Sequence, residues 1–201
     1  MAVSVSYREA YRHHRRVRGK PRERLVLYSL RLLLHHGEGF VVRRISGRRQ
    51  AETKEHIPDI AVFFKGREVA QVEVTGTEVP FCEMKVKGIF VLPSKARYAE
   101  KQGERYILVF FNDPEFPCGE WLLWIPGHKL VRAVAYADEW VGETIHGCIE
   151  RYYVVPKRRF NGGRGGYGLV SLAHYIRYLA GLELDPRVDA LVNFMPTGCR
   201  K

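Results

Sequence analysis

The feature that most constrains the fold is a hairpin pattern between residues 59 and 75. Two runs rich in β-branched and aromatic residues, 59–64 and 68–75, flank a short Lys-Gly-Arg turn. Such runs around a glycine-containing turn are typical of two antiparallel strands. Because side chains alternate across a strand, Glu73 faces away from the side that its flanking valines bury. The pattern therefore predicts a sheet with a carboxylate inside an otherwise apolar strand.

Helices and further strands are predicted on both sides of this hairpin. Pro21 suits the first turn of a helix whose leucine-rich face extends to Leu34. The other predicted elements are strands over 40–45, 87–92 and 105–111, a helix over 94–102 capped by Ser94 and ended by Gly103, further strands over 121–125, 129–136 and 151–155 that extend the sheet, and a helix over 169–180. This alternation predicts an α/β protein, and 201 residues suit one domain.

The positive charge of the chain is concentrated at one end. Residues 1–50 hold 13 basic and 3 acidic side chains, so they contribute +10 of the net charge of +11. A polycationic segment attracts polyanions, and nucleic acid is the favoured partner ahead of an anionic membrane surface. The alternative interpretation of residues 1–20 is a basic tail that only improves solubility.

Several classes of protein are disfavoured by the sequence. It contains no run of 18 apolar residues and no secretory signal pattern at its start, so we expect a cytoplasmic protein without a membrane span. The four cysteines are far apart and form no C-x-x-C pair, which argues against a zinc or iron–sulfur site.

Two acids in the hairpin are candidates for metal binding. Asp59 follows Pro58 at the entrance of the first strand, and Glu73 lies inside the second. Two carboxylates and a main-chain carbonyl at one end of a sheet suit a hard divalent cation. The alternative is a turn aspartate and a solvent-facing glutamate. Glutamate is disfavoured in strands, and its flanking valines indicate partial burial, so a functional role is favoured.

This arrangement resembles the PD-(D/E)XK nuclease superfamily, which has the restriction-endonuclease-like fold. The similarity is nearest to archaeal Holliday-junction resolvases and related archaeal or viral nucleases. The matching segments are Gly19-Lys20, Arg22-Glu23-Arg24-Leu25, Gly39-Phe40, Arg44, Ser46-Gly47, Pro58-Asp59-Ile60 and Val72-Glu73-Val74-Thr75. The resemblance implies a mixed central sheet flanked by helices. It places a nuclease core at 21–112, after a basic lead-in at 1–20, with 113–201 adding strands and a C-terminal helix to the same domain.

The resemblance also implies roles for individual residues. By position, Glu23, Asp59 and Glu73, with the carbonyl of Val74, would bind Mg²⁺ or Mn²⁺. Glu9 is the substitute for Glu23, because the helix that follows Glu23 is longer than in typical resolvases. Thr75 occupies the position of the motif lysine and cannot supply an ammonium group. The candidates to replace that lysine are Lys95 at the start of the next helix, which packs beside the active edge in this fold, and then Lys85 and Lys87.

The expected activity is Mg²⁺-dependent hydrolysis of DNA by a resolvase-like endonuclease that is dimeric by family analogy. The residues expected to contact nucleic acid are Arg12, Arg15, Arg16, Arg18, Arg43, Arg44, Ser46 and Arg164. Two alternatives remain: a nucleic-acid-binding module that has lost catalysis, motivated by Thr75, and a metal-independent RNA-processing nuclease. A G-x-G-x-x-G pattern at 163–168 is interpreted as a loop and not as a dinucleotide site, because it lies near the C-terminus and outside a first βα turn.

Overall fold

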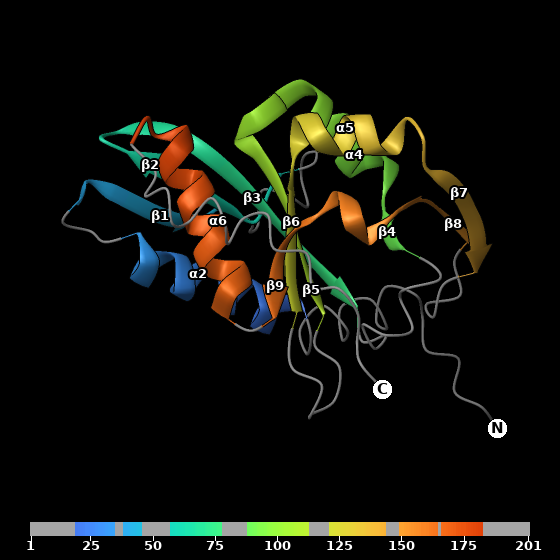
Figure 1. The fold of residues 1–201 in the computed structure, drawn as a ribbon, viewed down its shortest axis with the longest axis horizontal. Helices are drawn as coiled ribbons and strands as arrows, with labels where there is room; N and C mark the ends of the chain where they lie inside the picture. Colours follow the sequence, from blue (N-terminus) through green and yellow to red (C-terminus); the bar gives the residue numbers. More distant parts are fainter. Residues whose placement is uncertain are drawn as a thin grey trace.

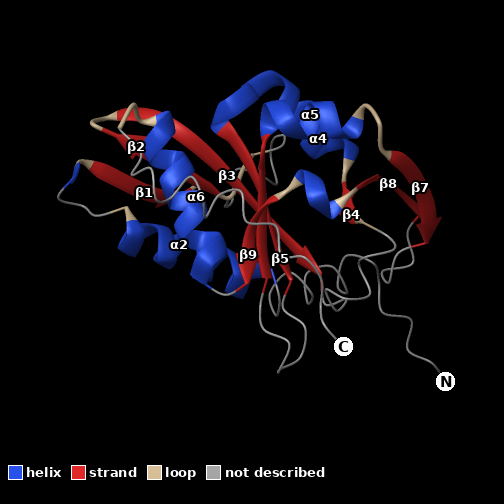
Figure 2. Ribbon diagram, viewed as in Figure 1, coloured by secondary structure: helices blue, strands red, loops and turns tan. Residues whose placement is uncertain are grey.

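The computed structural model describes residues 19–34, 38–45, 57–77, 88–112, 121–143, 149–164 and 166–182. In these residues a six-stranded sheet has helices on both faces, and a three-stranded sheet lies to one side (Figures 1 and 2). The elements are α2 (Lys20–Leu33), β1 (Phe40–Arg44), β2 (Ile60–Phe64), β3 (Arg67–Thr77), β4 (Ile89–Val91), α4 (Pro93–Gln102), β5 (Tyr106–Asn112), β6 (Trp121–Pro126), α5 (Gly127–Val134), β7 (Asp138–Glu143), β8 (Ile149–Val155), β9 (Asn161–Arg164) and α6 (Gly166–Leu179), with short 3₁₀ turns η4 (Gly103–Arg105) and η5 (Lys157–Arg159). The predicted α/β class, with a mixed central sheet flanked by helices, is confirmed.

The large sheet has the strand order β1-β2-β3-β5-β6-β9. The predicted hairpin is confirmed as β2 and β3, which pair antiparallel. Lys65 and Gly66 connect them with φ angles of 48° and 81°. Positive φ at both central residues is the turn geometry whose twist matches that of two paired strands. β3 then pairs in parallel with β5, and α4 lies in the connection between them, so the sheet is mixed.

The two faces of the large sheet bury separate cores. On one face α2 and α6 pack over a cluster that includes Leu30, Val72 and Trp124. On the other face α4 and α5 cover a cluster that includes Leu108 and Ile125. Alternation along β3 and β5 sorts the side chains between the two faces. The same alternation directs the polar positions of β3 toward the side of α4.

Two predictions about the second half of the chain are wrong. The strands predicted over 87–92 and 151–155 are confirmed as β4 and β8, but β8 belongs to a separate sheet of order β4-β8-β7 and does not extend the large one. The segment 129–136 is helical in α5 and not a strand, because Leu130 and Ala133 recur at a helical spacing that buries one side. Its valines suggested a strand, since β-branched residues are enriched in strands.

The ends of α4 and the start of α6 show the local effects of proline and glycine. Ser94 does not cap α4: Leu92 occupies the cap position, without a side-chain cap, and Pro93 starts the helix. Gly103 ends it with a φ of 60°, as predicted. The pattern at 163–168 is not a loop but joins the antiparallel edge strand β9 to α6. A Cβ atom at Gly168 would clash with the carbonyl oxygen of Leu122, so this glycine allows the close packing of helix and strand.

Residues beyond 112 take part in both sheets: β6 and β9 continue the large sheet past β5. The proposed boundaries at 20 and 112 stay predictions. In the described residues, no helix has the length and apolar character needed to cross a membrane.

Candidate active site

Asp59 lies just before β2, between β1 and β3, at one end of the large sheet. Its backbone N–H donates to the carbonyl of Val72 at 3.1 Å, and its own carbonyl accepts from the N–H of Ile45 at 2.9 Å. Its side-chain Oδ2 accepts a hydrogen bond from the backbone N–H of Val74 at 2.8 Å. Only 6% of the residue is exposed. The carboxyl group therefore has a fixed orientation against the middle of β3.

Glu73 and Lys95 meet on the α4 side of the sheet. Glu73 pairs in register with Leu108 of β5 and is 7% exposed. Lys95 lies in the first turn of α4, and its Nζ is 3.0 Å from Oε1 of Glu73. Thr75, at the position of the motif lysine, lies two residues along the same strand face. The structure thus brings a lysine from α4 to the motif glutamate.

Glu23 approaches the same region from α2. It lies in the first turn of the helix and is 7% exposed. Arg44 of β1 donates from Nη2 to Oε2 of Glu23 at 2.6 Å, and this arginine is partly exposed. The charge of Glu23 also acts on Asp59, as the pKa of that group shows. The first helix therefore contributes a third acid to the electrostatics around Asp59.

The pKa of Asp59 records how these charges interact. The pKa is raised from 3.8 to about 8, first by burial and then by the negative charges of Glu73 and Glu23. The hydrogen bond from Val74 and the charge of Lys95 act in the opposite direction but are weaker. Without an additional cation, Asp59 is therefore mostly protonated at pH 7.

The donor set fits a hard divalent cation. The three acids carry three negative charges when ionised, whereas Arg44 and Lys95 supply two positive charges. Burial is the main cause of the raised pKa of Asp59 and the neighbouring acids add to it, and a bound cation would offset both effects by stabilising the ionised carboxylate. Carboxylate oxygens are the ligands that Mg²⁺ and Mn²⁺ prefer. In the described part of the chain, no three His, Cys, Asp or Glu side chains are grouped closely enough to hold a metal ion together.

Three neighbouring residues were missed by the sequence analysis as members of this site. The hydroxyl of Tyr98 donates to Oε1 of Gln71 at 2.8 Å, and the Tyr98 ring lies 5.3 Å from that of Tyr106, edge to face. Burial raises the pKa of Tyr106, and the charges of Glu73 and Asp59 raise it further. Gln71 could have been found, because it shares the polar face of β3 with Glu73. The two tyrosines carried no signal beyond that of core aromatics.

The residues predicted to contact nucleic acid are not all brought together. Arg43 and Arg44 are adjacent in β1 and lie on opposite faces of the sheet. Arg44 pairs with Glu23, while Arg43 is exposed and its Cζ lies 5.5 Å from the centre of the Phe63 ring. Arg164 lies in the edge strand β9. The remaining predicted positions, Glu9, Arg12, Arg15, Arg16, Arg18, Ser46, Lys85 and Lys87, are outside the described residues.

Comparisons with known proteins found one notable likeness of fold. No protein-family model matches the sequence, and no curated protein matches it. Among solved structures, the chain is similar to D212, described as a nuclease from a fusellovirus, with a TM-score of 0.47 and 17% sequence identity. The similarity covers 80% of this chain and 92% of that one. This similarity concerns the fold alone and does not identify the residues of a site.

Proposed function

We propose that this chain is a metal-dependent endonuclease that hydrolyses phosphodiester bonds in DNA with a PD-(D/E)XK-type site. The observation that carries the proposal is the buried group formed by Asp59, Glu73 and Lys95. It combines oxygen donors for a cation with a positively charged side chain that reaches the motif glutamate from another element. A purely structural ion pair between Lys95 and Glu73 would not need a second buried acid, Asp59, whose pKa is raised to about 8.

In this proposal each residue has a distinct task. Asp59 and Glu73, with Glu23 and the Val74 carbonyl, would hold Mg²⁺ or Mn²⁺. When bound, the metal would act as a Lewis acid on the phosphodiester and lower the pKa of a water molecule. Asp59 would lose its proton to serve as a ligand, so metal affinity should rise with pH. Lys95 would place a positive charge beside the scissile phosphate.

DNA is the proposed substrate because the excess of positive charge lies in the first 50 residues, the segment that supplies Glu23 and Arg44. Arg43 is exposed on the sheet face that also carries Glu73. It would contact a phosphate of the DNA strand that is cleaved. A branched substrate and a homodimer are the finer parts of the proposal. They rest on the resemblance to resolvases.

The second candidate is a nucleic-acid-binding module without catalysis, on the same fold. Thr75 favours it, because the motif lysine is absent from β3. The two candidates differ in whether Lys95 replaces that lysine in the reaction. The Lys95–Glu73 contact of 3.0 Å supports the catalytic one.

The test is cleavage of branched, duplex and single-stranded DNA, and of RNA of the same sequence, with Mg²⁺, Mn²⁺ or EDTA. We expect metal-dependent cleavage of DNA, which Asp59→Asn should reduce at least about a thousandfold, since loss of a ligand removes the Lewis acid. Asp138→Asn is the matched control, because Asp138 is an exposed acid of β7, in the other sheet. Binding without cleavage of any substrate would support the inactive module. Activity retained in EDTA would support a metal-independent RNA-processing nuclease.

A further inference from the structure

The contact between Lys95 and Glu73 belongs to a larger two-point attachment of α4 to β3. Lys95 and Tyr98 are three residues apart on α4, so they share one face of the helix. Glu73 and Gln71 are two residues apart on β3, so they share one face of the strand. Lys95 Nζ lies 3.0 Å from Glu73, and the hydroxyl of Tyr98 donates to Gln71 at 2.8 Å. Two side chains of α4 therefore each contact one side chain of β3.

The second attachment point is itself oriented by its neighbours. Nε2 of Gln71 donates to Oε1 of Glu68 at 2.6 Å, which leaves Oε1 of Gln71 to accept from Tyr98. The Tyr98 ring also rests against Tyr106, which is fully buried. One hydrogen bond and one ring contact thus fix the side chain of Tyr98 at both ends. Without the hydrogen bond, the ion pair would be the single one of these two polar contacts left between α4 and β3.

We propose that Tyr98 and Gln71 are positioning residues, which hold α4 in the register that places Lys95 at the active site. This inference rests on the proposed function. A lysine at position 75 would be placed by β3 itself, like Glu73. Lys95 instead lies on a helix that packs mainly against α5. The position of its ammonium group relative to Glu73 therefore depends on the contacts between α4 and β3. The Tyr98–Gln71 hydrogen bond is such a contact, and it lies one helical turn from Lys95.

The first test separates positioning from stability. Tyr98→Phe removes only the hydroxyl and leaves the Gln71 acceptor without this donor, so both the melting temperature and kcat should fall. In the double variant Tyr98→Phe/Gln71→Leu neither position keeps a polar group to satisfy, and Glu68, which loses the Gln71 donor, is only partly buried and can bind water instead, so the melting temperature should recover. The rate should not recover: we expect kcat to stay about 10- to 100-fold low with KM nearly unchanged, because a small misplacement of a catalytic group has this effect. Recovery of kcat together with stability would overturn the inference.

Two controls define the effect further. Tyr175→Phe removes a hydroxyl of α6 that donates to the Glu104 carbonyl at 3.5 Å in an exposed contact, and α6 covers the face of the sheet opposite to α4, so kcat should match that of the wild type. In a Lys95→Met background, Tyr98→Phe should cause no further loss of rate, since there is no ammonium left to position. An additional tenfold loss in that background would contradict a role through Lys95.

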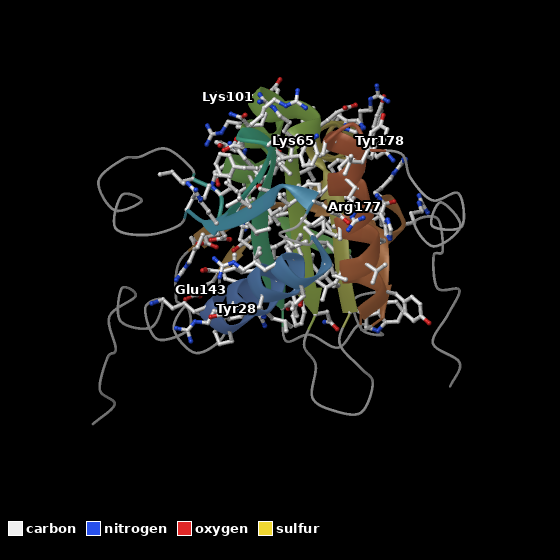
Figure 3. All side chains as sticks on the ribbon, turned by 90° about the vertical axis from the view of Figure 1, so that its left-hand side faces the viewer. Tyr28, Lys65, Lys101, Glu143, Arg177 and Tyr178 are labelled. Carbon is white, nitrogen blue, oxygen red and sulfur yellow. The ribbon has the colours of Figure 1, made fainter. Side chains whose placement is uncertain are left out.

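A second readout does not require cleavage. Reductive methylation with formaldehyde, followed by mass spectrometry, measures how accessible each lysine is. In Tyr98→Phe we expect Lys95 to be methylated several times faster, while Lys101, which lies at the outer surface (Figure 3), keeps its rate. Unchanged protection of Lys95 would overturn the inference even in an active nuclease. Protection that depends on Tyr98 in a protein that cleaves nothing would count against the proposed function and leave the positioning role standing.

Discussion

Two of the ion pairs among the described residues lie in opposite surroundings. Lys95 and Glu73 are 3.0 Å apart, with side chains 12% and 9% exposed. Arg151 and Glu139, on β8 and β7 of the small sheet, are 3.5 Å apart, with side chains 61% and 46% exposed. Removing two charges from water is costly, and a buried pair often contributes less stability than apolar residues of the same size. The buried pair is therefore better explained by chemistry than by stability.

The small sheet shows how this protein stabilises a hairpin without buried charge. The rings of Phe90, Trp140 and Tyr152 come from its three strands and lie 5.5 to 5.9 Å apart. Aromatic contacts of this kind stabilise neighbouring strands directly. The large sheet buries both aliphatic and aromatic side chains on its two faces, and among its described strand residues Glu73 is the one buried charged side chain. Glu73, with the buried Asp59 just before β2, therefore departs from the apolar packing around it.

The largest effect should come from breaking the buried pair. Lys95→Met leaves Glu73 buried without its ammonium partner, so we expect a loss of about 3–5 kcal/mol in the free energy of unfolding, together with the loss of cleavage. Urea denaturation and cleavage assays measure the two quantities. Lys95→Met/Glu73→Leu should recover most of the stability and none of the activity. If the double variant were as unstable as the single one, the pair would be a net stabilising interaction, and the contrast with the small sheet would disappear.

The next effect concerns the pH dependence of stability in EDTA. The pKa of Asp59 is raised from 3.8 to about 8 in the folded protein, so between these values the folded state binds a proton that the unfolded state has released. The contribution of this group to stability is therefore fully present below pH 4 and is lost as the pH rises to about 8. Asp59→Asn cannot ionise, so it should be more stable than the wild type by a few kcal/mol at pH 9 and nearly equal at pH 4.

The metal provides the complementary measurement. Mg²⁺ or Mn²⁺ at pH 9 should raise the melting temperature of the wild type and not that of Asp59→Asn, because only the folded wild type offers the complete donor set.

In the EDTA experiment, equal pH profiles of stability for the wild type and Asp59→Asn would show that Asp59 keeps an ordinary pKa. That result would also remove the electrostatic argument for a metal site.

The part of this site that lies on the hairpin could be predicted from the sequence, because local patterns determine it. Alternation around a Lys-Gly turn specifies β2 and β3, and therefore the face on which Glu73 lies. The approach of Lys95 was predicted only through the family resemblance. Tyr98 was missed because its role depends on the rotation of α4 about its axis, which is set by packing on α5 and β5. No local pattern encodes that angle.

The errors in the fold have a similar origin. Residues 129–136 contain valines that suit a strand, and only burial against the large sheet selects the helix α5. The strands β4 and β8 were found as segments, but the sheet to which they belong depends on pairing between residues more than 60 positions apart. A high strand propensity shows that a segment suits a β-sheet, but it does not identify the strand with which that segment pairs.

The smallest effect should be seen at the exposed pair. Arg151→Ala removes an ion pair that water and salt already screen, so the free energy of unfolding should change by no more than about 0.5 kcal/mol. Any difference should vanish in 1 M NaCl, where the Debye length is only about 3 Å and charges at a greater separation are screened from each other. Cleavage should be unaffected, because this pair belongs to the small sheet. Urea denaturation at low and high salt, run beside Lys95→Met, provides the measurement. A loss comparable to that of Lys95→Met would mean that burial does not distinguish the two pairs, and the functional interpretation of Lys95 would then need support from cleavage data alone.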